Sequence, residues 1–235
     1  MKSILKTLFY LGFVMSKYGI RNFLISATVE IYYSFIYFNF ETFNFFKNKI
    51  YIFKKNEKYS TANIPTPFYF LYKIKSFYKK KNFDMNYFVD LGCGSGRTGL
   101  FFSTYFNLKF IGIDFNKSLI AKNKKKHKNK KNFHFYNFNL TNIKKLKILL
   151  IRLKKKNKNI SGLTIFVSDS FDKYLIKKII LNLKKNFNFN FIMINQSDNN
   201  FFKEFKKAYY KEFQSKTFKK VRKIDSLRNL AIYKV

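Results

Sequence analysis

The residues of this chain whose types and spacing can do chemistry lie in one short segment. The apolar stretch at 88–91 contains one acid, Asp90, and the next five residues, 92–96, read Gly-Cys-Gly-Ser-Gly. The chain has eight glycines, and four of them lie between positions 92 and 99. Because glycine adopts positive φ and lets a backbone approach a ligand closely, this concentration predicts a binding turn after a strand. A helix that starts directly after the turn presents free N–H groups, which is typical of sites for nucleotide-type ligands.

A second acid, Asp114, ends the next apolar run, at 109–114. The two acids are expected at the carboxyl ends of two strands, the edge at which open α/β sheets bind ligands. A carboxylate at Asp114 can accept hydrogen bonds from a ribose diol. Asp90 would repel a pyrophosphate, because both groups are negative, and it suits a ligand with a cationic amine. Together the two acids favour a nucleoside ligand that carries positive charge.

The elements that must position these residues follow a regular alternation from position 85 onward. Apolar runs predict strands, and the segments between them have helical spacing of apolar residues. The predicted strands are 87–91, 109–114, 133–138, 163–167 and 190–194, with a closing hairpin near 217–223 and 230–235. The predicted helices are 68–78, 98–107, 117–130, 143–156, 172–185 and 201–213. This order predicts a doubly wound, mostly parallel sheet with helices on both faces.

The N-terminal segment, 1–58, is glycine-poor and rich in aromatic residues, and it predicts a helical extension with a short strand at 50–53. The two prolines of the chain, Pro65 and Pro67, mark the turn that leads into the following domain, 59–235. An apolar run at 24–40 favours a helix that packs on the domain. Attachment to a membrane surface is the second interpretation of this run, and a membrane span is the third.

Composition leaves two interpretations of the charge open. The net charge is +36, which is typical of proteins that bind nucleic acid or another polyanion. Only five of the 48 basic residues are arginine, and residues with AT-rich codons dominate the chain, so a base-composition bias also explains much of the lysine. One cysteine and two histidines exclude an intramolecular disulfide, predict no metal site and fit a reducing, cytoplasmic location.

Two motifs of the sequence resemble those of a known family. The motif Val-Asp-Leu-Gly-Cys-Gly-Ser-Gly at 89–96 looks like the first motif of class I S-adenosylmethionine-dependent methyltransferases, and Ile-Gly-Ile-Asp at 111–114 looks like their second-strand acid. The resemblance covers about 59–235, and within this family the sequence is similar to bacterial members of unassigned substrate. It implies a Rossmann-like, seven-stranded sheet with a reversed terminal strand. It also implies S-adenosylmethionine as cofactor, with its ribose on Asp114 and its methionine part on Asp90, Gly92, Gly94 and Gly96.

Two positions depart from the family pattern. The acid that usually contacts adenine after the third strand is matched by Asn139, whose amide oxygen can still accept a hydrogen bond. After the fourth strand the chain reads Ser-Asp-Ser-Phe-Asp at 168–172, without the proline of the amino-methylating motif. Here Asp169 is a candidate to accept an N–H from the methyl acceptor, and Phe171 is a candidate to stack on it. An equal alternative is that this segment only caps the next helix.

The sequence therefore predicts methyl transfer from S-adenosylmethionine to an unidentified acceptor, which is an amino group of a protein, an RNA base or a small molecule. Two alternatives stay open: a non-catalytic RNA-binding protein on the same scaffold, and a membrane-surface protein anchored through 24–46. No catalytic triad is expected, because the sulfonium already activates the methyl group. Cys93 is interpreted as a small filler of the turn, and His134 as a structural residue.

Overall fold

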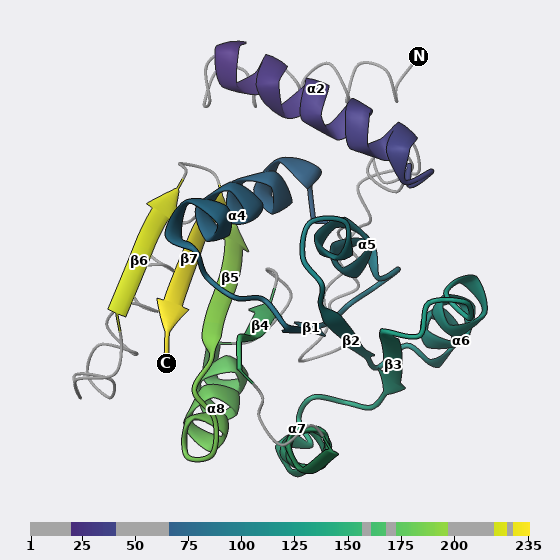
Figure 1. Cartoon of the computed structure of the whole chain (residues 1–235), viewed down its shortest axis with the longest axis vertical. Coiled ribbons are helices and arrows are strands. Elements are labelled where there is room, and N and C mark those ends of the chain that lie inside the picture. The colour runs from purple at the N-terminus through teal and green to yellow at the C-terminus, as the bar shows by residue number, and fades with distance from the viewer. Residues whose placement is uncertain (1–19, 41–65, 157–160, 168–172, 197–218, 225–227) are drawn as a thin grey trace.

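A computed structural model of the chain describes residues 20–40, 66–156, 161–167, 173–196, 219–224 and 228–235 (Figure 1). Its strands are β1 (Tyr87–Leu91), β2 (Lys109–Asp114), β3 (Phe133–Asn137), β4 (Leu163–Val167), β5 (Asn190–Gln196), β6 (Lys219–Ile224) and β7 (Arg228–Lys234). The helices in the described ranges are α2 (Ile20–Ile36), α4 (Phe68–Lys81), α5 (Arg97–Ser103), α6 (Lys117–Lys126), α7 (Ile143–Lys156) and α8 (Lys173–Lys184).

The strands form one sheet in the order β3-β2-β1-β4-β5-β7-β6. Strands β1 to β5 are parallel, whereas β7 runs antiparallel to β5 and β6 antiparallel to β7. The α/β fold with a parallel core is therefore confirmed. The chain moves outward from β1 through β2 to β3 and then returns to the other side of β1 with β4. The strand order reverses at β1, where ligand sites form in open sheets.

Helices cover both faces of the sheet. In the view of Figure 1, α7 and α8 lie below the strands, and α4 and α5 lie above them. The lower core joins Leu146 and Leu150 of α7 and Ile180 of α8 to one set of strand residues. The upper core is aromatic: the ring of Phe88 on β1 lies 5.7 Å from that of Phe166 on β4 and 4.8 Å from that of Phe102 on α5. Alternate residues of β1 enter the two cores, as a pleated strand requires.

Several helix ends differ from the predicted ones for local reasons. α5 ends at Ser103, four residues earlier than predicted, because the hydroxyls of Ser103 and Thr104 donate to the Leu100 carbonyl and compete with the backbone ladder. α6 ends at Lys126 instead of position 130, and His127 follows as its C-cap. α4 continues through the lysines at 79–81, until Asn82 ends it in the left-handed conformation, with φ of 51°. The predicted strand at 50–53 and the predicted helix at 201–213 lie outside the described residues.

The described part of the N-terminal extension is α2, which packs on α4 and α5. Tyr33 is buried, and its hydroxyl lies 2.8 Å from that of Tyr105, just beyond α5. The hydroxyl of Tyr37 donates to Thr104 over 2.9 Å. Residues 1–19 and 41–58 of the predicted extension lie outside the described ranges. No helix in the described part of the chain is both long and apolar enough to span a membrane.

Candidate functional site

The turn between β1 and α5 needs glycine at three alternate positions. Gly92, Gly94 and Gly96 all have left-handed φ, of 80°, 49° and 76°. A side chain at any of them would strain the backbone, because residues with a Cβ rarely adopt this region. The amides of Gly92 and Cys93 both donate to the Ile113 carbonyl, over 2.8 and 3.0 Å, so the turn is tied to the last residues of β2.

Two further glycines allow close packing against β2, Gly99 for the start of α5 and Gly112 for the turn that precedes it. A Cβ added at Gly99 would come within 2.5 Å of the Phe110 ring. A Cβ added at Gly112 would come within 2.8 Å of the Cys93 sulfur. The glycine enrichment that marks the sequence therefore serves the turn as well as the close contact between helix and strand. Cys93 is buried, and this burial raises the pKa of its thiol well above the usual value, which agrees with a packing role.

Asp114 links the end of β2 to the turn. One of its carboxylate oxygens, Oδ2, accepts the Gly94 amide over 3.0 Å, and the other, Oδ1, accepts the Asn116 amide over 2.8 Å. The Asn123 side chain of α6 donates to the Gly94 carbonyl over 2.6 Å and holds the turn from the other side. Because a carboxylate oxygen has about two acceptor sites, both oxygens of Asp114 can still accept a hydroxyl from a ligand.

Asp90 is the most deeply buried acid of the site, at 1% exposure. Its carboxylate accepts the hydroxyl of Thr98, in the first turn of α5. The pKa of Asp90 is raised to about 7, chiefly by burial; the Thr98 hydrogen bond lowers the pKa, and the nearby Asp114 charge adds a smaller rise. A cationic ligand group next to Asp90 would favour its ionised form.

The structure brings five of the predicted cofactor residues together around the turn: Asp90, Gly92, Gly94, Gly96 and Asp114. The sixth, Asn139, is exposed just beyond β3, and its side-chain oxygen accepts the Thr141 amide over 3.0 Å. Their roles as cofactor ligands stay predictions. The two candidates for the acceptor side, Asp169 and Phe171, lie outside the described residues.

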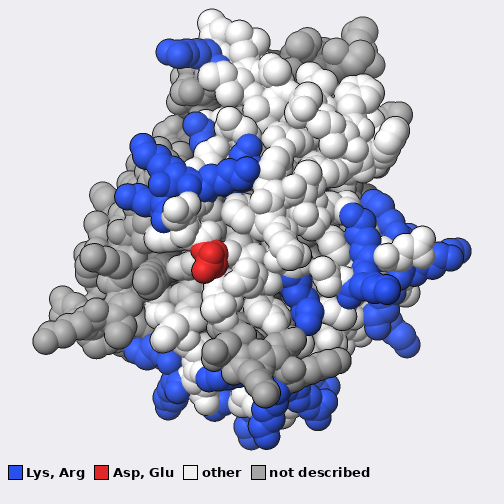
Figure 2. Space-filling view, in the orientation of Figure 1, with Lys and Arg blue, Asp and Glu red and all other residues white. Residues whose placement is uncertain are grey.

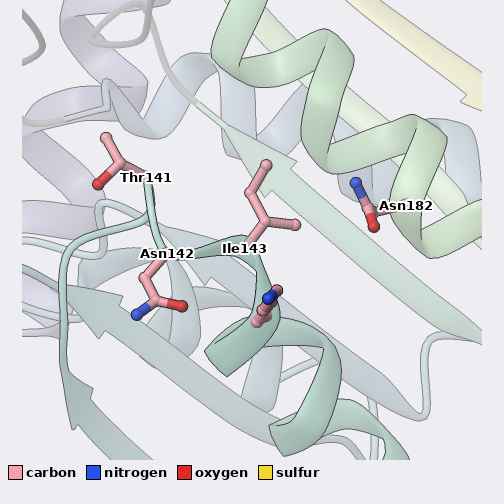
Figure 3. A pocket seen from close by; sticks show the side chains of 5 residues that line it. Thr141, Asn142, Ile143 and Asn182 are labelled. Carbon is pink, nitrogen blue, oxygen red and sulfur yellow. The ribbon is translucent and has the colours of Figure 1, made fainter.

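A surface pocket of about 470 Å³ opens two residues after Asn139, at the start of α7. Figure 3 shows Thr141, Asn142 and Ile143 on the segment that leads into α7, with Asn182 on α8. Lys144 completes the lining. The lining contains none of the predicted site residues.

Sequence reasoning missed an ion pair that connects the N-terminal helix to the turn. Arg97, the first residue of α5, pairs with Glu30 of α2, and both side chains are nearly inaccessible. The second oxygen of Glu30 accepts the Phe68 amide over 2.7 Å, and the Arg97 guanidinium lies 3.7 Å above the Phe68 ring. The signal in the sequence is scarcity: Glu30 is one of 12 acids, it interrupts an apolar helix, and Arg97 is one of five arginines.

Three of the four acids in the described residues are buried, namely Glu30, Asp90 and Asp114, and the fourth, Asp84, is exposed. Each buried acid bonds to a residue between 94 and 98. Within the described residues, the buried acids thus lie around one turn. Arg97 balances the charge of Glu30, so Asp90 and Asp114 are the acids that favour a ligand with cationic or hydroxyl donors.

Comparison with known proteins supports a family assignment. A family model described as a methyltransferase domain matches residues 82–226, which is more than half of the chain. No curated protein matches the chain.

Solved structures give only distant likenesses. The chain is similar to an MtNAS mutant (10% identity, TM-score 0.45), and the likeness covers 70% of this chain and 59% of that one. It is also similar to a putative methyltransferase, yhhF, from Escherichia coli (14%, 0.49, covering 73% and 86%) and to an rRNA methylase from Streptococcus thermophilus (11%, 0.46, covering 73% and 97%). The family assignment rests on the family model alone.

Removing the Glu30 carboxylate should destabilise the whole domain. We expect Glu30→Ala to lower the free energy of unfolding by about 3–5 kcal/mol, because it removes the carboxylate that pairs with the buried Arg97 charge. Urea unfolding followed by circular dichroism measures this loss. The exposed acid provides the control, since Asp84→Ala should change stability by less than about 0.5 kcal/mol. Equal effects of the two variants would contradict a structural role for the ion pair.

The ionisation of Asp90 should make stability depend on pH. Because the pKa of Asp90 in the folded chain, about 7, lies above its usual 3.8, the folded state holds this proton more tightly than the unfolded state. The stabilisation is complete below pH 4 and is lost as the pH rises through 7. We therefore expect the free energy of unfolding to fall from pH 5 to pH 8 in the wild type relative to Asp90→Asn. Parallel pH profiles for the two proteins would show that Asp90 titrates normally.

Proposed function

This chain belongs to the methyltransferase-domain family, and from that premise we propose that it transfers the methyl group of S-adenosylmethionine to RNA. The cofactor follows from the family. The acceptor is our own inference from the charges at the edge of the sheet that carries the glycine turn.

The residues around the turn fit S-adenosylmethionine by their chemistry. The cofactor carries an ammonium, a ribose diol and an adenine amine, all of which donate hydrogen bonds, and the site offers acceptors. We assign the ammonium to Asp90, the ribose hydroxyls to Asp114 and the adenine amine to Asn139. The hydroxyl of Ser95, within the turn, is buried with no hydrogen-bond partner in the described structure.

When bound, the cofactor supplies a methyl group that its sulfonium already activates. The chain's own residues therefore need to orient the two reactants and exclude water, with no built-in nucleophile. The turn suits this task because its conformation is fixed by hydrogen bonds to β2 and α6 before any ligand arrives. On the acceptor side, Asp169 and Phe171 follow β4, and we propose that they contact the base that receives the methyl group.

Exposed lysines at two helix starts carry the proposal of an anionic acceptor. Helices in an α/β sheet run antiparallel to the strands, so α6 and α7 begin at the edge where β1 and β2 end. Lys117 in the first turn of α6, and Lys144 and Lys145 in the first turn of α7, are exposed there.

A base-composition bias alone does not explain this placement. A cation at a helix N-terminus opposes the helix dipole and costs about 0.3–1 kcal/mol. If a mutational bias were the only cause, more lysines should be retained at helix C-termini, where they are favourable, than at helix N-termini. An anion held at the sheet edge would offset the cost. A polyanion such as RNA fits, because it supplies one phosphate for each nucleotide.

Transfer of a labelled methyl group tests the proposal. The full chain is incubated with S-adenosylmethionine labelled in its methyl group and with total RNA, a protein extract or a small-molecule fraction. We expect label in RNA, and we expect the variant Lys144→Glu/Lys145→Glu to reduce it at least tenfold while cofactor binding persists. The matched control is Lys124→Glu/Lys125→Glu, which makes the same charge change at exposed lysines near the end of α6.

Each outcome decides a different part of the proposal. Label confined to protein or to small molecules would overturn RNA as the acceptor and leave the methyltransferase assignment intact. If the two lysine variants lose the same amount of label in RNA, only the net charge of the chain matters and the position of the lysines does not. RNA binding without label, in protein that binds the cofactor, would favour a non-catalytic RNA-binding protein on this scaffold.

A further inference from the structure

The helix α2 exposes an apolar face, and we propose that this face docks on an anionic lipid surface. One stripe of the face contains Ile20, Leu24, Ile31 and Phe35, with 46–62% of each residue exposed. A second stripe beside it contains Ile25, Tyr32 and Ile36, with 43–59% exposed. We call these seven residues the outer face of α2.

The outer face lacks the lysines that cover other exposed helix positions. No lysine lies between Lys17 and Lys47, although Lys and Arg together number 48 in the chain. The only charged side chains of α2 are Arg21, at its start, and Glu30, which is buried. Figure 2 shows a broad white area over α2, whereas blue side chains surround the rest of the visible face. The codon bias favours isoleucine, phenylalanine and tyrosine as well as lysine, so it accounts for the residue types of the face, but it does not by itself explain why lysine is absent from this stretch.

The opposite side of α2 is firmly held, which fixes the direction of the outer face. Glu30, Tyr33 and Ser34 are buried, and Glu30 pairs with Arg97. The hydroxyl contact of Tyr33 with Tyr105 adds a second anchor beside this pair. The helix is therefore anchored to the domain. One apolar side faces the domain and another faces outward, so α2 is only weakly amphipathic.

The net charge of the chain indicates which kind of partner binds the outer face of α2. A second copy would also carry +36, and two such chains repel each other at moderate salt. RNA offers phosphates and polar edges, which do not cover seven apolar side chains. A bilayer with anionic lipids supplies both an apolar interior for the outer face and negative headgroups for the lysines. No described helix can span a membrane, so α2 would lie in the interface plane.

The sequence that flanks α2 is basic, which suits an anionic partner. Lys2, Lys6 and Lys17 precede α2, and Lys47 and Lys49 follow it. Each basic residue near an anionic bilayer contributes about 1 kcal/mol to binding. Tyrosine prefers the headgroup level, and Tyr32 supplies it on the outer face, whereas Phe35 has a wholly apolar ring that suits the acyl region. The inference is independent of the methyl acceptor, because it uses none of the residues assigned to the cofactor or to the acceptor.

A single tryptophan can report insertion, because the chain contains none. We would compare full-length Phe35→Trp with the control Ile148→Trp, which replaces an apolar residue that is 48% exposed on α7. Both are mixed with vesicles of phosphatidylcholine, with and without phosphatidylglycerol, whose acyl chains are brominated. We expect the emission of Phe35→Trp to shift to the blue and to be quenched in anionic vesicles only, with no quenching of Ile148→Trp.

A polar variant gives a second readout. Leu24→Asn/Phe35→Asn should weaken sedimentation with anionic vesicles at least about tenfold, because two apolar side chains no longer enter the bilayer. The change Ile148→Asn should leave it unaltered. Circular dichroism and cofactor titration of each variant show whether the domain stays folded.

Three results would overturn the proposal. Sedimentation of Phe35→Trp without quenching would mean that lysines adsorb to headgroups and the outer face stays out of the bilayer. Blue-shifted emission without vesicles, together with a dimer mass, would mean that a second copy covers the face. The same emission in a monomer would mean that another segment of this chain covers it.

Discussion

The hydrogen bond from the Gly94 amide to the Asp114 carboxylate is the contact on which the arrangement of the site depends. It fixes the turn after β1 to the end of β2, and it does so with an oxygen that can still accept a ligand hydroxyl. Left-handed glycines on both sides of this contact let the backbone fold back without side chains. The glycine pattern in the sequence and the acid that ends the next strand are therefore two parts of one structural unit.

The same structural unit contains buried acids. Asp114 lies close enough to Asp90 for its charge to raise the pKa of Asp90, and burial removes the water that would screen this effect. The N-terminal helix adds Glu30, whose charge is balanced by Arg97 at the first position of α5. The extension thus belongs to the structure that supports the turn, while its outer face is left for contacts outside the domain.

The parts of the fold that sequence reasoning could predict are those with short-range causes. Strands β1, β2 and β4 have their predicted bounds, because continuous apolar runs end at polar residues or glycine. The sequence predicts the ends of α5 and α6 too far along the chain, because apolar residues continue at helical spacing beyond both ends. In the structure, hydroxyl groups compete with the backbone at the end of α5, and a histidine follows α6 as its C-cap. The Glu30–Arg97 pair joins residues that are 67 positions apart, and no local pattern reports such a contact. Asn123 gave no signal either, since asparagine is abundant throughout the chain.

The most direct test of the account is calorimetric titration of the full chain with S-adenosylmethionine. Wild type and Asp84→Asn, which changes an exposed acid, should bind with equal affinity. Asp114→Asn should bind about 10- to 150-fold more weakly, because a hydrogen bond to a charged group contributes about 1.5–3 kcal/mol. Absence of binding heat from folded wild-type protein, or equal affinity in all three proteins, would contradict the claim that the turn between β1 and α5 holds the cofactor.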